Sequence, residues 1–134
     1  MVKEISAKDF IKLDKSKITI VDMREESEYS NKNIEGSINI PVSKFWAGVD
    51  NIPKDKPVYV FCNSGYFSEE MVILLEERGY NATNVLGGYE AIKDCEKEWN
   101  SFVTIYIIKI QQIAKRFPRL KNFKRDKEFS SRSV

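Results

Sequence analysis

This 134-residue chain is most informative at Pro57-Val58-Tyr59-Val60-Phe61-Cys62-Asn63-Ser64-Gly65-Tyr66-Phe67-Ser68. The apolar run 58–61 predicts a buried strand, and residues 68–78 predict a helix because their apolar side chains recur at helical spacing. A cysteine between such a strand and helix faces backbone N–H groups and the positive end of the helix dipole. That environment lowers the pKa of a thiol and makes its sulfur a nucleophile. Cys62 is therefore the candidate nucleophile.

Strands and helices alternate on both sides of this stretch. Residues 18–21, 36–41 and 84–86 predict further strands, whereas residues 6–13, 25–31 and 42–49 predict short helices. Alternation over short connections predicts an α/β fold with a parallel sheet and helices on both faces. Sites in such sheets lie at the carboxyl ends of the strands. Asp22, Cys62 and Gly87 all fall at those predicted ends.

Composition excludes several kinds of site. The chain has no histidine and only two cysteines, Cys62 and Cys95. This rules out Cys–His and Ser–His–Asp catalysis and leaves too few cysteine and histidine ligands for a typical structural zinc site, so we expect no metal. No long apolar segment opens the chain, and no apolar run approaches the roughly 18 residues that span a bilayer. We therefore expect no signal peptide, no transmembrane segment and a reducing, cytoplasmic location.

The loop after Cys62 is suited to holding an anion. Asn63, Ser64 and Gly65 are small and turn-prone, so the backbone can aim its N–H groups inward. Ser68 is expected to cap the following helix. The alternative is a buried cysteine that only fills space, and such a cysteine does not need an anion-binding loop directly after it.

The stretch from Cys62 to Ser68 resembles the active loop of rhodanese-like sulfurtransferases, in which a Ser-Gly pair and a helix-opening serine follow the cysteine. The family's first block resembles Asp22-Met23-Arg24, Glu28-Tyr29, Ile34-Glu35-Gly36-Ser37 and Asn39-Ile40-Pro41, and its last block resembles Gly87-Gly88-Tyr89. The resemblance covers about residues 3–98 and implies the rhodanese-like α/β fold. It also implies that Asp22 and Arg24 help to shape the site, although a purely structural ion pair is an alternative.

The activity implied by the resemblance is sulfur transfer through a Cys62 persulfide. The donor would be a small molecule such as thiosulfate or a persulfide, and the acceptor a thiol or cyanide, with no cofactor. Residues 63–68 would form the substrate-binding loop, with Tyr66 and Phe67 either lining its mouth or packing in the core. Three departures from the family pattern are Lys32-Asn33, where members often have Gly-His, Phe67, where many have arginine or another cationic or polar residue, and the lack of the tryptophan that members commonly carry near Ile92.

The sequence also leaves two other functions open. Because Phe67 lacks the positive charge that would hold an anionic donor, the chain could instead be a non-catalytic rhodanese-like binding or regulatory module. A phosphatase on the same scaffold ranks last, since the loop from Cys62 to Phe67 is short and has no arginine. Cys95 is either a second sulfur carrier or, as we expect, a solitary helix cysteine.

The C-terminal part differs from the rest in composition. Residues 1–108 hold 13 Lys/Arg and 18 Asp/Glu, whereas residues 109–134 hold nine and two. We expect a rhodanese-like domain over residues 1–100, then an amphipathic helix and basic tail over 101–134. The helix is expected to dock on the domain, with a partner, self-association through residues 102–117 or a membrane surface as alternatives. No nucleic-acid recognition motif is present, so we expect no nucleic-acid partner.

Overall fold

The computed structural model describes residues 1–118. The expected basic tail beyond residue 118 therefore lies outside the described residues. The described chain contains five strands and five α-helices, with short 3-10 turns at Lys15–Lys17, Val42–Lys44 and Val49–Asn51.

The strands form one parallel sheet in the order β1-β5-β4-β2-β3. Their bounds are β1 Glu4–Ile5, β2 Thr19–Asp22, β3 Ile38–Asn39, β4 Val58–Phe61 and β5 Ala82–Val85. β4 lies at the centre, paired with β2 on one side and β5 on the other. The residue that follows β4 therefore emerges in the middle of the sheet's carboxyl edge.

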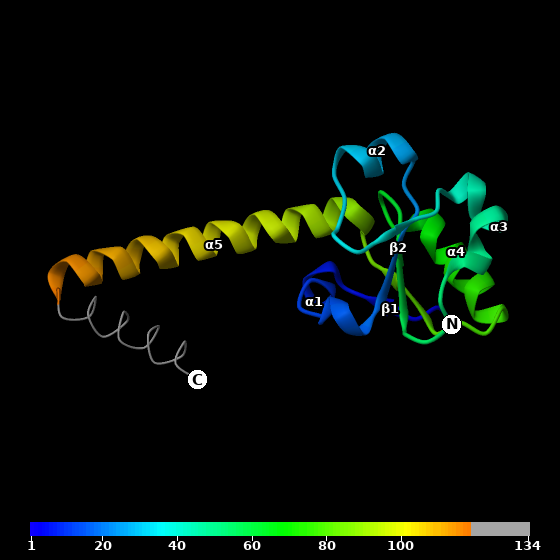
Figure 1. The fold of residues 1–134 in the computed structure, drawn as a ribbon, viewed down its shortest axis with the longest axis horizontal. Coiled ribbons are helices and arrows are strands. Elements are labelled where there is room, and N and C mark those ends of the chain that lie inside the picture. Colours follow the sequence, from blue (N-terminus) through cyan, green and yellow to red (C-terminus); the bar gives the residue numbers. More distant parts are fainter. Residues whose placement is uncertain (119–134) are drawn as a thin grey trace, which may run out of the picture. The chain divides into compact units, whose positions relative to one another are not determined.

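Helices cover both faces of the sheet, which confirms the predicted fold class (Figure 1). Their bounds are α1 Ala7–Phe10, α2 Glu26–Asn31, α3 Phe45–Gly48, α4 Tyr66–Glu77 and α5 Gly88–Arg116. One core lies between the sheet and α3 and α4, and the other lies between the sheet and α1 with the first turns of α5. In β4, Val58 and Val60 enter the first core while Tyr59 and Phe61 face the second.

The chain divides into two compact units, Met1–Glu96 and a second that begins at Lys97. The helix α5 contributes residues to both. Within the described part of the chain, none of the helices has the length and apolar character required to cross a membrane.

The structure differs from the predicted elements most clearly in three places. The edge strand β1 was not predicted, because two residues are too few to show a periodic pattern. β5 begins at Ala82 rather than Asn84. α4 begins at Tyr66, with Gly65 as its N-cap residue, so the prediction that Ser68 caps this helix is wrong.

Candidate active site

Cys62 directly follows β4 and is buried. Three residues later the backbone has turned back, and the N–H of Gly65 donates a hydrogen bond of 3.2 Å to the Cys62 Sγ. The sulfur thus lies against the N-terminus of α4, where N–H groups are not used within the helix.

A left-handed glycine makes this turn. Gly65 has φ of +86°, and a Cβ at this position would lie 3.0 Å from the N atom of Gly87. Only a residue without a side chain fits both the backbone angle and the close approach of the two loops. The loop after β4 and the loop before α5 therefore form one packed site.

The carbonyl groups of the cysteine loop point toward α5. The Cys62 carbonyl accepts a hydrogen bond of 2.8 Å from the N–H of Tyr89, and the Asn63 carbonyl accepts one of 3.2 Å from Glu90. Because these carbonyls are held there, the N–H groups of the same loop are free to face the sulfur.

The environment of Cys62 favours the thiolate. Burial alone would raise the pKa of the Cys62 thiol, but the Ser68 hydroxyl and the N–H groups of Ser68, Gly65 and Ser64 outweigh it and lower the pKa. The Ser68 hydroxyl has a single proton, and in this structure that proton lies on a hydrogen bond to Asn84. The backbone N–H groups are therefore the main donors that stabilise the Cys62 thiolate.

Ser68 and Asn84 form a buried polar pair beneath the loop. The Ser68 hydroxyl donates to the Asn84 Oδ1 over 2.7 Å, and the Asn84 Nδ2 donates to the Gly65 carbonyl over 3.2 Å. Both side chains are almost fully buried. Since Asn84 belongs to β5, it fastens the start of α4 to the neighbouring strand.

The remaining loop side chains point outward. Tyr66 and Phe67 are exposed and pack against each other edge to face, with ring centroids 5.5 Å apart. The Asn63 side chain donates to the Glu28 carboxylate of α2 over 3.2 Å. The structure thus brings Ser64, Gly65 and Ser68 to the sulfur and leaves two aromatic rings on the surface beside them.

Asp22 and Arg24 form a buried ion pair at the end of β2. The Arg24 Nη2 lies 2.8 Å from the Asp22 Oδ2 and 2.7 Å from the Lys32 carbonyl, just after α2. The guanidinium also lies 3.6 Å from the centroid of the Tyr89 ring, at the start of α5. The pair therefore ties together three elements around the carboxyl edge of the sheet.

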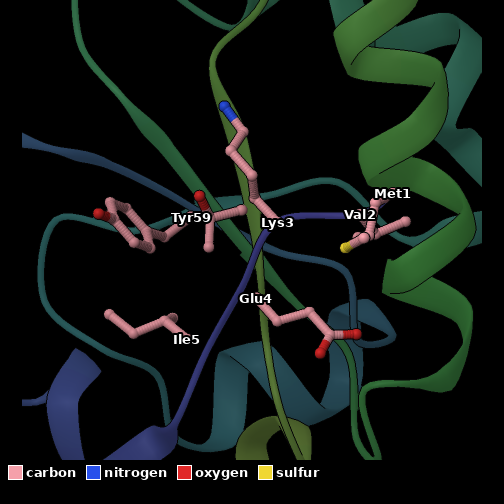
Figure 2. Close-up of a pocket in the computed structure, with 7 residues that line it drawn as sticks. Met1, Val2, Lys3, Glu4, Ile5 and Tyr59 are labelled. Atoms are coloured by element: carbon pink, nitrogen blue, oxygen red, sulfur yellow. The ribbon is translucent and has the colours of Figure 1, made fainter.

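A separate pocket of about 550 Å³ lies at the β1 edge of the sheet. Figure 2 shows Ile5 and Tyr59 on the same side of β1 within it. The pocket shares no residue with the cysteine loop, and its lining contains no cysteine. It is therefore separate from the site around Cys62.

Sequence reasoning missed Asn84 and the exact role of Gly88. Asn84 was assigned only to a strand, although a polar residue in a strand buried on both faces indicates a specific partner. A Cβ on Gly88 would lie 2.4 Å from the Cys62 carbonyl oxygen, which shows how closely α5 approaches the loop. Cys95, by contrast, is half-buried and packs against the core between the sheet and α5.

Comparison with known proteins agrees with this geometry. The rhodanese-like domain family matches residues 6–95. The thiosulfate sulfurtransferase GlpE of Coxiella burnetii is 30% identical over 95 residues, which are 69% of this chain and 89% of the relative.

Two solved structures are similar as well. A rhodanese-related protein of Thermoplasma volcanium is 30% identical, with a TM-score of 0.64 over 69% of this chain and 91% of its own. The reduced CoADR-RHD of Bacillus anthracis is 28% identical, with a TM-score of 0.66 over 72% of this chain, although the match spans only 17% of that longer protein. The chain belongs to the rhodanese-like domain family.

Proposed function

We propose that the chain is a sulfurtransferase that carries a sulfane sulfur on Cys62. The observation that carries the proposal is the buried sulfur bonded by the Gly65 N–H at the N-terminus of α4, with a lowered thiol pKa. A cysteine that only filled space would gain nothing from such donors. The sulfurtransferase named among the relatives lends further support.

The reaction follows from nucleophilic chemistry at sulfur. The Cys62 thiolate attacks the outer sulfur of a donor, a new S–S bond forms at Sγ, and the donor's own bond to that sulfur breaks. With thiosulfate, sulfite leaves with the electron pair. The resulting persulfide anion is stabilised by the N–H groups that stabilise the thiolate. An acceptor thiolate or cyanide then attacks the terminal sulfur and restores the Cys62 thiolate, so no external oxidant is needed.

Mass spectrometry of the intact protein tests the proposal. The protein is incubated with thiosulfate or with glutathione persulfide, and we expect a mass gain of one sulfur atom that cyanide removes. Cys62→Ser should not take up sulfur, whereas Cys95→Ser, which removes the other thiol, should retain the gain. Absence of the adduct with both donors would identify a non-catalytic rhodanese-like module instead.

A further inference from the structure

The part of α5 that follows Lys97 carries an apolar row along one side. At 3.6 residues per turn, this row contains Trp99, Val103, Tyr106, Ile110, Ile113 and Phe117. All of these side chains except Val103 are exposed. Phe117 follows the last helical residue, and its N–H still bonds the Ile113 carbonyl. The row thus continues to the end of the helix.

The apolar side is broad. Phe102, Ile107 and Ala114 flank the row and widen it to an arc of roughly 140°, in which no polar residue falls. Ile105 and Ile108 lie outside the arc, among polar residues. A two-stranded coiled coil needs only the narrow central row. The breadth of this face instead suits a surface on which the helix can lie flat.

The charges of this segment indicate what kind of surface its apolar side binds. Residues 99–117 contain three cations, Lys109, Lys115 and Arg116, and no acidic residue. Residues 118–134 add six Lys/Arg and two Asp/Glu to the sequence. Within residues 99–117, a second copy of the segment offers Lys109 and Arg116 only further cations, and the nearest acidic residue of α5, Glu98, precedes the segment. An anionic lipid surface complements the same charges.

The side chains within the arc fit a lipid interface. Trp99, Phe102, Tyr106 and Phe117 are aromatic, and aromatic rings gather at the boundary between lipid headgroups and acyl chains. Lysine and arginine beside an apolar face can extend their charged ends to the phosphates while their stems stay on the apolar side. The polar half of the helix remains in water.

We propose that residues 99–117 lie on the surface of an anionic membrane, with the apolar arc inserted at headgroup depth. The inference is independent of the sulfur chemistry at Cys62, since it uses no residue of the cysteine loop. It places a rhodanese-like unit at a membrane surface.

Vesicle flotation with the full chain tests this directly. The protein is mixed with vesicles of phosphatidylcholine alone or with about 30 mol % phosphatidylglycerol. We expect the partition coefficient to be at least ~10-fold higher on the anionic vesicles, and the difference to vanish at about 0.5 M salt. Equal binding to both vesicles, or binding to neither, would overturn the proposal.

A matched pair of variants separates the apolar face from charge alone. Ile110→Glu with Ile113→Glu adds two negative charges within the arc, and Gln111→Glu with Gln112→Glu adds the same two on the polar half. The first variant should lose flotation, whereas the second should retain a measurable part of it. Equal losses in the two variants would contradict insertion of the apolar face.

The fluorescence of Trp99 shows whether this residue enters the membrane, once Trp46 is replaced. In a Trp46→Phe background, Trp99 is the sole tryptophan, and its emission should shift to the blue on anionic vesicles. Sedimentation equilibrium tests the competing occupant. A dimer in solution that Ile110→Glu with Ile113→Glu dissociates, together with unshifted Trp99 emission on vesicles, would assign this face to a second copy of the chain and overturn the membrane assignment.

Discussion

At the level of single residues, the Cys62 thiolate is stabilised by hydrogen-bond donors that a neutral thiol does not require. Because these donors lower its pKa, the thiolate fraction at neutral pH is higher than for a free cysteine, whose pKa is about 8.5. In a Cys95→Ser background, the rate of alkylation by iodoacetamide should therefore reach half its maximum below that pH.

Ser68→Ala checks the cause of this shift. The substitution removes a hydroxyl whose proton is bonded to Asn84 and keeps the backbone N–H groups, so the alkylation midpoint should stay close to that of the protein with Ser68. A midpoint at the free-thiol value in the unsubstituted protein would mean that the loop does not stabilise the thiolate. A midpoint that rises in Ser68→Ala toward the free-thiol value would show that the Ser68 hydroxyl also stabilises the thiolate.

We predict that Phe67 influences which donors the site accepts. Its ring is 56% exposed, so a substitution does not disturb the core. Phe67→Arg adds a cation beside the cysteine loop and should raise kcat/KM for thiosulfate by roughly threefold to tenfold, a modest gain because solvent screens an exposed charge. Phe67→Gln, which adds polarity without charge, is the control. If both variants alter thiosulfate and neutral persulfide donors equally, the residue acts through loop packing.

At the level of elements, the close approach of α5 to the cysteine loop is the most sensitive contact. Gly88 has φ of +60°, and a Cβ there would meet backbone oxygen atoms of Cys62 and Asn63 at 2.4 and 2.6 Å. Gly88→Ala should therefore displace the loop and reduce both stability and sulfur transfer. Gly36→Ala is the matched control, because Gly36 has φ of +81° with no atom within 4 Å of a Cβ.

Gly36→Ala separates the steric clash expected in Gly88→Ala from the backbone strain that both substitutions cause. Gly36→Ala should cost about 1–2 kcal/mol of unfolding free energy and leave sulfur transfer intact. Thermal unfolding and turnover are measured for both variants. Equal losses of stability together with unchanged turnover would show that the contact between α5 and the loop does not hold the site.

The same elements show what the sequence could predict. The strand Val58–Phe61 and the helix after it were predictable because their apolar spacing is local, and Cys62 followed from their junction. The start of α4 was not, because Gly65 acts as N-cap through its backbone angle rather than through a side chain. The Ser68–Asn84 bond joins residues 16 apart on different elements, and such tertiary contacts leave no periodic trace in the sequence.

At the level of the whole rhodanese-like unit, the buried Asp22–Arg24 pair connects β2, the end of α2 and the start of α5. Asp22→Ala would leave the Arg24 charge buried without a counterion, which typically costs ~3–5 kcal/mol. We expect urea unfolding to show a loss of that size. Asp50→Ala removes a surface pair with Arg78, in which Asp50 is 85% exposed, and should change the unfolding free energy by ~0–1 kcal/mol.

A double variant distinguishes loss of the pair from the penalty of an isolated charge. Asp22→Asn with Arg24→Met removes both charges, so most of the destabilisation seen in Asp22→Ala should be recovered. Because the pair also orders the surroundings of Tyr89, whose N–H holds the Cys62 carbonyl, sulfur transfer by the double variant should stay below that of the unsubstituted protein even when stability returns. Full recovery of both stability and turnover in the double variant would show that the ion pair can be replaced by uncharged packing without loss of function. A loss of stability in Asp22→Ala no greater than that in Asp50→Ala would show that Arg24 finds another partner.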